Sequence, residues 1–245
     1  MVQVLYTSDS YIIVNKKYDM YINSDDPNEK NTVAYHIGCH DSHRSTSATP
    51  LHFVQRLDYS TSGVLCIAKN KKAAAEAGKA LERRDAKKYY LAVLRGHVGK
   101  RLLDVSFPVG SNTTPGNTHK MVAVTDSSVV CGHPRSAITK ILVLDTDYYK
   151  DEPITYVMMK PTTGRRHQLR VHCHAMGHPI LGDFTYSDRS DTEPYRMYLH
   201  AYRLVLPLPH EPIDVCCPSG WDPVWSGEEI SSCRAACDEL DQHSN

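Results

Sequence analysis

The sequence lacks an excess of charge of either sign and a long apolar run. Its 28 Lys and Arg residues equal its 28 Asp and Glu residues, so it does not have the overall basic charge of a protein that coats nucleic acid through charge alone. It has no apolar run of about eighteen residues or more, so we expect no membrane-spanning helix. With 41% hydrophobic and 23% charged residues, the composition is that of an ordinary folded globular protein rather than a disordered chain.

The start of the sequence and the spacing of its cysteines lead to two further expectations. Met1 leads directly into the strand-like segment 2–6, so neither a signal peptide nor an Arg-rich transit segment is expected. The 8 cysteines are scattered and none forms a CxxC pair, which favours free thiols in a reducing compartment. We therefore expect a soluble intracellular protein, with the cytoplasm as the first expectation and the nucleus or mitochondrion still open.

One segment is strongly basic although the whole chain is neutral. Between residues 69 and 101 only Glu76, Glu82 and Asp85 oppose a series of basic residues, which are Lys69, Lys71, Lys72, Lys79, Arg83, Arg84, Lys87, Lys88, Arg95, Lys100 and Arg101. Such a segment could follow a phosphate backbone. A solvated helix face followed by a strand explains the same charges, and both interpretations stay open.

The hydrophobic pattern predicts many strands and few helices. We expect strands at 11–14, 64–68, 88–94, 120–125, 137–144, 154–159 and 198–206, and helices at 32–38, 71–84, 168–176 and 228–241. Residues 23–50 indicate a long loop with a mobile stretch at 41–49, and Gly177 is expected to end the third helix. One domain over residues 1–210 and a peripheral tail over 211–245 are predicted.

The first string that suggests chemistry is QRLDYSTSG, residues 55–63, just before an apolar strand. Asp58 lies beside Arg56 on a loop rich in small hydroxyl residues. A carboxylate in this setting could be an ionised nucleophile whose pKa is lowered by its basic partner. It could equally cap a surface turn, and the string alone does not separate the two roles.

The second string covers residues 162–183 and is rich in arginine and histidine. Its arginines could pair with a carboxylate and with phosphates, because the planar guanidinium suits both. The histidines at 172, 174 and 178 suggest zinc, but helical residues two apart point in different directions and no familiar set of four ligands is present. We therefore predict no metal site.

Together these strings resemble the RluA family of pseudouridine synthases. The family signatures His-Arg-Leu-Asp-x-x-Thr-Ser-Gly, Lys-x-Tyr-x-Ala-x-x-x-Gly and Gly-Arg-x-His-Gln-Ile-Arg-Val-His, the last leading to Gly-His-Pro-Ile-x-Gly-Asp, correspond to residues 55–63, 88–96 and 164–183. The resemblance extends from Ile13 to Ala201. The usual histidine of the first signature is Gln55 here, a change expected to affect loop packing more than chemistry. No S4-type module precedes the core, so RNA capture is expected from the catalytic domain or from partners.

The resemblance implies an α+β fold with a mixed, mostly antiparallel sheet, flanking helices and a central active-site cleft. It implies an RNA pseudouridine synthase that isomerises uridine in structured RNA as a monomer without a cofactor, whether the RNA is tRNA, rRNA or mRNA. A catalytically silent RNA-binding protein on the same fold is the alternative. A hydrolase using Ser62, or Asp58 with Asp183, is a third interpretation, but the chain lacks a nucleophile elbow.

The resemblance also assigns catalytic roles. Asp58 becomes the catalytic carboxylate, as nucleophile or base. Tyr90 is expected to stack on the flipped uracil, although a core aromatic on a strand is the simpler alternative. Arg170 is expected to pair with Asp58 and keep it charged.

Five residues are predicted to bind substrate. Arg56 would hold the target nucleotide out of the helix, and Arg165 could exchange roles with Arg170. Arg166 and His167 would contact phosphate or cap the adjoining helix, and Leu169 would form an apolar wall beneath the base. Asp183 is interpreted as part of a structural turn.

Overall fold

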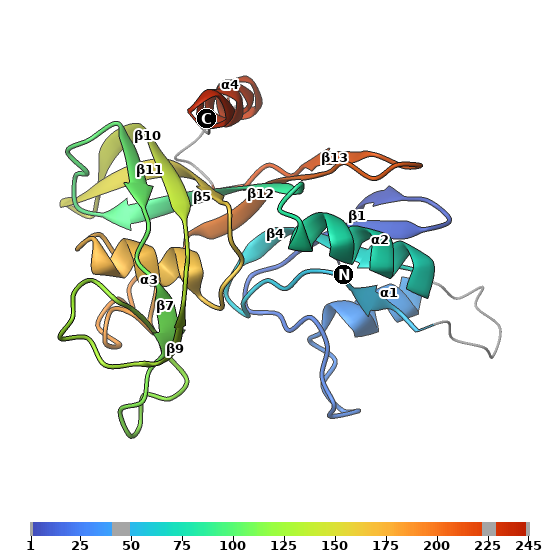
Figure 1. Cartoon of the computed structure of the whole chain (residues 1–245), viewed down its shortest axis with the longest axis horizontal. Helices are drawn as coiled ribbons and strands as arrows, with labels where there is room; N and C mark the ends of the chain where they lie inside the picture. The colour runs from blue at the N-terminus through green and yellow to red at the C-terminus, as the bar shows by residue number, and fades with distance from the viewer. Residues whose placement is uncertain (1, 41–49, 222–228, 244–245) are drawn as a thin grey trace. The chain divides into compact units, whose positions relative to one another are not determined.

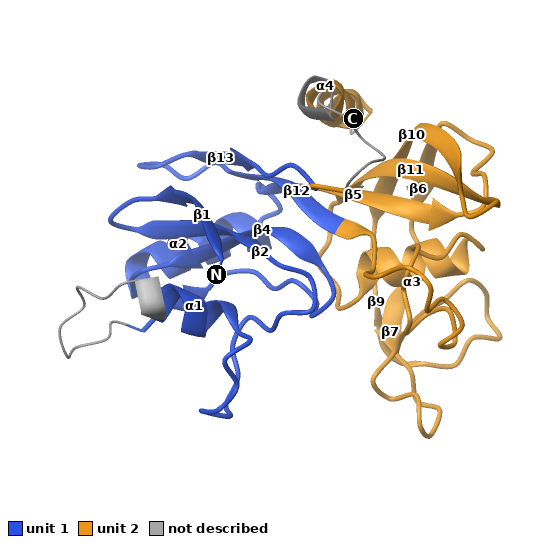
Figure 2. Ribbon diagram, turned by 180° about the vertical axis from the view of Figure 1, so that it is seen from behind, with its two compact units in different colours: residues 1–88, 200–219 blue, residues 89–199, 220–245 orange. Residues whose placement is uncertain are grey.

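The computed structural model describes residues 2–40, 50–221 and 229–243 (Figure 1). The stretch 41–49, predicted to be mobile, lies outside the described residues. The chain divides into two compact units, which Figure 2 colours separately. Unit 1 comprises Met1–Lys88 and His200–Ser219, and unit 2 comprises Tyr89–Leu199 and Gly220–Asn245. Within the described ranges, no helix is long and apolar enough to cross a membrane.

Unit 1 is built on a sheet with the strand order β1 (Gln3–Thr7), β2 (Tyr11–Lys16), β4 (Ser62–Ala68) and β12 (Leu199–Leu206). Two short strands extend it, because β3 (His52–Phe53) pairs with β4 and β13 (Ile213–Cys216) pairs with β12. β2 runs antiparallel to β4, whereas β12 runs parallel to it. Every residue of β4 is buried, as expected for a continuous apolar strand covered on both faces.

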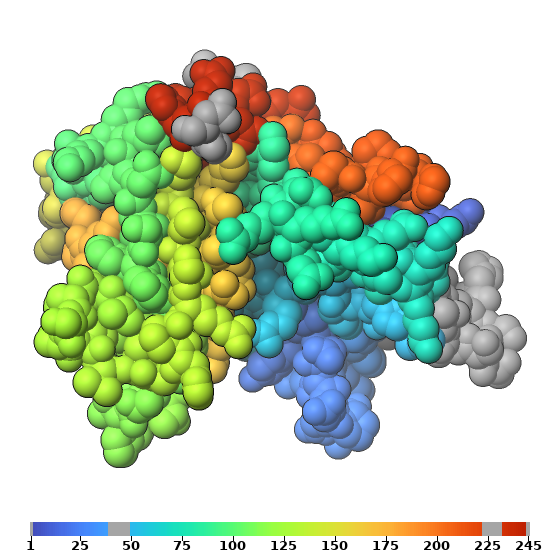
Figure 3. Space-filling view, in the orientation of Figure 1, coloured from blue at the N-terminus to red at the C-terminus, as the bar shows by residue number. Residues whose placement is uncertain are grey.

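Two helices belong to unit 1, α1 (Val33–His40) and α2 (Lys71–Glu82). The side chain of Asn70 caps α2 by accepting a hydrogen bond from the amide of Ala73 at 2.9 Å, which satisfies one of the unpaired donors at a helix start. α2 buries an alanine face in the core of the unit, against β4. Its lysines are exposed, and the teal residues of α2 form part of the visible surface in Figure 3.

Unit 2 contains two groups of antiparallel strands. The larger has the order β5 (Lys87–Arg95), β11 (Glu152–Pro161), β10 (Thr139–Tyr149) and β6 (Leu102–Val105), and the smaller has the order β8 (Met121–Ala123), β7 (Val109–Ser111) and β9 (Gly132–Arg135). The prediction of an α+β fold with mostly antiparallel strands is confirmed.

The helix α3 (Gln168–Ala175) carries much of the second sequence string. Its buried face joins the apolar core of unit 2 through Leu169 and Cys173. Gly177 follows the helix with φ +80° and donates to the carbonyl of His174, while His178 donates to the carbonyl of Cys173. This pattern is a Schellman end, so the predicted role of Gly177 is confirmed.

The segment after residue 210 contributes β13 to unit 1 and α4 (Glu229–Gln242) to unit 2. α4 contacts β10 and β11, and its side chains Cys233, Cys237 and Leu240 are fully buried. The hydroxyl of Tyr89 donates to the carboxylate of Asp241 at 2.6 Å. The predicted boundary at residue 210 stays a prediction.

Candidate active site

Asp58 lies in unit 1 at the first position of a tight turn. The amide of Thr61 donates to the backbone carbonyl of Asp58 at 3.1 Å and closes this turn. The Asp58 side chain is half-buried, whereas Thr61 is almost fully buried. The backbone of Asp58 therefore makes the turn, and the residue stays partly accessible to solvent.

A buried lysine fixes the residue after Asp58. Lys16 is 0% exposed, and its ammonium group donates to the carbonyls of Lys17, Met20 and Tyr59 at 2.9, 2.7 and 2.8 Å. Burying a charge is costly unless hydrogen bonds compensate it, and an ammonium group has three protons to satisfy. The three carbonyls supply this compensation, so Lys16 ties the end of β2 to the Asp58 loop.

The other end of the loop is held by a histidine on β12. The Ser62 hydroxyl and His200 Nδ1 lie 2.8 Å apart, and His200 Nε2 lies 2.8 Å from the carbonyl oxygen of Cys217. Because a carbonyl oxygen only accepts, Nε2 carries the ring proton and the serine donates to Nδ1. Ser62 is 4% exposed, so its hydroxyl holds the loop in place and is not positioned as the nucleophile of a hydrolase.

Gly63 completes this attachment. Its φ is +110°, and a Cβ at this position would lie 2.2 Å from the carbonyl oxygen of Ala201. Only glycine lets the loop approach β12 this closely. Gln55, which stands where the family has histidine, donates from Nε2 to the carbonyl of Val64 at 3.2 Å, a packing role for the substituted residue. Arg56 is exposed.

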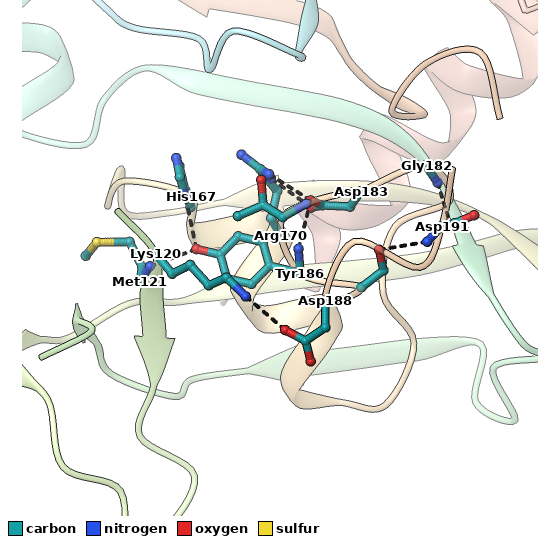
Figure 4. Close-up of polar contacts among 11 residues, drawn as sticks. Lys120, Met121, His167, Arg170, Gly182, Asp183, Tyr186, Asp188 and Asp191 are labelled. Carbon is teal, nitrogen blue, oxygen red and sulfur yellow. Dashed lines mark hydrogen bonds and ion pairs between the residues drawn. The ribbon is translucent and has the colours of Figure 1, made fainter. Parts of the chain in front are cut away.

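In unit 2, Arg170 forms a buried ion pair with Asp183 (Figure 4). Arg170 Nε and Nη2 donate to the two carboxylate oxygens at 2.8 and 2.7 Å. Arg170 is 5% exposed and Asp183 is 1% exposed. Asp183 also accepts hydrogen bonds from the amides of Thr185 and Tyr186, so the expected turn at Asp183 is present, but the sequence did not reveal its pairing with Arg170.

Tyr186 is a second residue that sequence reasoning missed. The Arg170 guanidinium lies over its ring, with Cζ 5.1 Å from the ring centre. The Tyr186 hydroxyl accepts from the amide of Met121 at 2.8 Å and lies 2.9 Å from His167 Nδ1 (Figure 4). Tyr186 therefore connects the start of α3 to β8. Its position three residues after Asp183 was the only hint in the sequence.

The residues just before α3 contact protein in this structure. Arg165 Nε donates to the carbonyl of Ser136 at 3.0 Å, and Arg166 Nη2 donates to the carbonyl of His119 at 2.8 Å. His167 occupies the N-cap position of α3 with φ 53°, and its side chain makes no capping hydrogen bond. The choice between a phosphate contact and capping by Arg166 and His167 stays a prediction.

Two predicted site residues contribute to the core of unit 2. Leu169 is 7% exposed and belongs to an apolar cluster that includes Leu94 and Ile141. Tyr90 is half-buried against the same cluster and lies opposite Met159 in the β5–β11 pair. The core-aromatic role of Tyr90 and a role in substrate stacking are compatible, because the side chain is not fully buried.

A buried polar network holds α3 against β10. Gln168 Nε2 donates to Thr139 Oγ1, and the same oxygen lies 3.0 Å from His172 Nδ1. His172 Nε2 lies 2.9 Å from the carbonyl oxygen of Phe107, so it carries the ring proton. Burial lowers the pKa of His172 below its usual value. Gln168 and His172 are therefore structural residues that orient the helix carrying Arg170.

The structure thus gathers Arg165, Arg166, His167, Leu169 and Arg170 at one helix of unit 2. Arg56 and Asp58 lie together in unit 1. Since Asp58 and Arg170 belong to different units, their predicted ion pair stays a prediction.

An anchored aspartate loop followed by a strand, within a mixed α+β chain, is the arrangement expected of the family that the motifs resemble. Residues 10–175 match the family model described as RNA pseudouridylate synthase. The chain belongs to this family, and it is an isomerase. The resemblance predicted from the sequence motifs is confirmed.

Individual proteins that are similar to this chain also have names that refer to pseudouridine synthases. The chain is 45% identical over 222 residues to the Danio rerio protein "RNA pseudouridylate synthase domain-containing protein 1", covering 90% of this chain and 75% of that protein. It is 36% identical over 157 residues to "Dual-specificity RNA pseudouridine synthase RluA" of Yersinia pestis, covering 64% and 71%. Its structure is similar to that of "Human RNA Pseudouridylate Synthase Domain Containing 1", with a TM-score of 0.77, 33% identity and coverage of 99% and 94%.

Proposed function

We propose that this chain isomerises uridine to pseudouridine within RNA and that Asp58 is the carboxylate that performs the reaction. One observation carries the assignment of Asp58. The backbone around it is fixed on three sides, by Lys16 at Tyr59, by the turn to Thr61 and by His200 at Ser62. Catalytic groups need this kind of support, because a small displacement of a reacting atom costs a large factor in rate.

The reaction needs an acid, a base and positioning rather than a redox group. The bond between ribose C1′ and uracil N1 breaks, the base turns, and a new bond joins C1′ to uracil C5. The proton on C5 is lost and N1 gains a proton, so atoms and electrons balance. A carboxylate can serve this chemistry as the nucleophile or as the base, and glycosidases show that a carboxylate can face an oxocarbenium-like sugar.

Arg170 and Tyr90 complete the proposed catalytic set. A guanidinium beside a carboxylate favours the charged form, so Arg170 would keep Asp58 ionised. Its Nε and Nη2 bonds to Asp183 hold the guanidinium plane in one orientation, which supports a fixed role. Tyr90 would stack on the flipped uracil, and Tyr90→Phe should therefore retain more activity than Tyr90→Ala.

Arg56, Arg165, Arg166, His167 and Leu169 are proposed to contact the substrate. The exposed Arg56 and Arg166 are the better candidates for phosphate contacts, because a charge that remains in water loses little on binding. Leu169 would act from the core side, as an apolar surface beneath the base.

The experiment is a comparison of Asp58→Asn with wild type on RNA that contains uridine. The variant keeps the shape of the side chain and removes its charge, so pseudouridine formation should be abolished while RNA binding changes less than about twofold. Asp9→Asn is the matched control, because Asp9 is an exposed aspartate of the same unit. Turnover by Asp58→Asn close to wild type would contradict the assignment.

Nucleoside analysis of the digested RNA separates the possible activities. Pseudouridine without free uracil is the expected product. Free uracil would indicate a hydrolase, and bound but unchanged RNA would indicate a silent binding protein. Mapping of pseudouridine across cellular RNA with and without the protein then identifies whether tRNA, rRNA or mRNA is modified.

We further propose that the protein acts as a monomer in an intracellular compartment, with the cytoplasm first. Cys66, Cys131 and Cys173 carry free thiols, and Cys66 and Cys173 are buried, which supports a reducing environment. Sedimentation of the purified protein tests the monomer, and imaging of the tagged chain tests the compartment.

A further inference from the structure

Two tyrosine rings are exposed together beside the Asp58 loop. Tyr21 and Tyr59 are 48% and 42% exposed, and their ring centres lie 4.6 Å apart with an angle of 51° between the planes. Tyr59 directly follows Asp58 in the chain. Single exposed apolar residues are ordinary, but paired aromatic rings that both face solvent mark a candidate contact surface.

The backbone beneath these rings is anchored. The carbonyl of Tyr59 accepts from Lys16 Nζ at 2.8 Å and from the amide of Met20 at 3.2 Å. Tyr21, in the segment between β2 and α1, donates its amide to the carbonyl of Asn31 and accepts from the amide of Val33. Rings held on a fixed backbone lose little conformational entropy when a ligand covers them.

The surrounding charge decides which part of an RNA could bind here. Partial burial raises the pKa of Tyr59, as do the nearby Asp19, Tyr21 and Glu29. The phenol therefore stays neutral near pH 7. Neighbouring carboxylates disfavour a phosphate group, whereas the uncharged face of a nucleobase can stack on an aromatic ring without an opposite charge.

We propose that Tyr21 and Tyr59 form a stacking platform for an unpaired RNA base next to the target uridine. This inference rests on the proposed function, because it takes Asp58 as the reacting group. Because Tyr59 is the neighbour of Asp58 in the chain and consecutive Cα atoms are about 3.8 Å apart, the nucleotide proposed for this platform is one that adjoins the uridine at Asp58. The preferred substrate is then a loop or bulge in which the neighbour of the uridine is unstacked, since RNA-binding proteins stack bases that are already splayed out.

The first test is the dissociation constant for a stem-loop RNA. Tyr21→Ala and Tyr59→Ala should each raise the Kd, by roughly 5- to 150-fold for a lost stacked base. Tyr21→Phe and Tyr59→Phe keep the ring and should stay within about twofold of wild type. Tyr148→Ala is the control, because Tyr148 is 63% exposed but lies in unit 2.

The second test uses 2-aminopurine in place of each nucleotide flanking the uridine. Wild type should quench the fluorescence at one flanking position, and Tyr59→Ala should abolish that quenching while Tyr59→Phe retains it. An unchanged Kd and unchanged quenching in both alanine variants would overturn the platform. Thermal unfolding of each variant confirms that it is folded, which is expected because both rings are exposed.

Binding and turnover are measured separately, so the two proposals can fail separately. Wild type that binds the stem-loop with tyrosine-dependent affinity but forms no pseudouridine would refute the proposed function and keep the stacking contact. Wild type that forms pseudouridine, with an RNA affinity that depends on neither ring, would keep the proposed function and refute the stacking platform.

Discussion

The replacement Asp183→Asn removes one charge from the buried pair with Arg170 and leaves the shape of the side chain almost unchanged. One Asp183 oxygen accepts from Arg170 Nη2 and from the amides of Thr185 and Tyr186, and the other accepts from Arg170 Nε. An amide has one oxygen and one NH2 group. In the better orientation, the asparagine oxygen takes the place of the carboxylate oxygen that accepts from Arg170 Nη2 and the two backbone amides. The asparagine NH2 group then faces the Arg170 Nε–H group, so two donors lie opposite each other.

The expected cost follows from burial. Both side chains are almost fully excluded from solvent, at 6% and 1% exposure, so water cannot replace the carboxylate charge that the guanidinium loses. Removing one partner of such a pair costs about 3–5 kcal/mol, a large part of the roughly 5–15 kcal/mol that stabilises a typical domain. Urea unfolding should show this loss as a lower midpoint at an unchanged slope.

The matched control is Asp104→Asn. Asp104 also pairs with a basic residue, Lys140 at 2.6 Å, but its side chain is 63% exposed, so the change should cost less than about 1 kcal/mol. A double variant with Arg170→Met should lose less stability than the sum of its single changes, because it also removes the buried positive charge that Asp183 compensates. If Asp183→Asn unfolds within about 1 kcal/mol of wild type, the pair does not support unit 2 in the way described.

Three further changes probe other buried contacts. Lys16→Met removes the ammonium donor from the carbonyls of Lys17, Met20 and Tyr59, of which only that of Tyr59 is known to keep another donor, the amide of Met20. The change should lower stability by about 1–3 kcal/mol in urea, and unchanged stability would mean that the ammonium group is not needed. Gly63→Ala should lower stability by at least about 1–3 kcal/mol. Its control is Gly116→Ala, where φ is +82° but a Cβ would have nothing within 4 Å, so this change should cost only the backbone strain. Equal losses of stability in thermal unfolding would argue against the close approach of Gly63 to β12. Burial lowers the pKa of His172 in the folded protein, so the unfolded chain binds a proton at this residue at a higher pH than the folded chain does. The contribution of His172 to stability is therefore complete above about pH 6.5 and declines as the pH falls. His172→Gln should make the melting temperature depend less on pH between pH 7 and pH 5, and an unaltered dependence would contradict this.

The local elements could be predicted well because neighbouring residues decide them. The helix expected at 71–84 is α2 (Lys71–Glu82), and the strand expected at 64–68 lies within β4 (Ser62–Ala68). Their signals are the alanine face, the asparagine before the first turn and the apolar run, all readable within a few residues. The end of α3 at Gly177 follows from the same local chemistry.

The roles of polar side chains were harder to predict because their partners are distant in the chain. Arg166 was expected to contact phosphate or cap a helix, but in this structure its guanidinium donates to a carbonyl 47 residues away. His167 adopts φ 53° and joins Tyr186 through its side chain. No periodicity in the sequence reports such contacts.

What the sequence by itself determined is the family, the main strands and helices, and the position of Asp58 in the signature of its loop. Only the tertiary structure decided what holds that loop. Tyr59 accepts from a lysine 43 residues away, and Ser62 pairs with a histidine 138 residues away. The physical reason is that secondary structure depends on the short-range geometry of the backbone, whereas a buried charge or hydroxyl is stabilised by whichever group the folded chain brings within hydrogen-bonding distance.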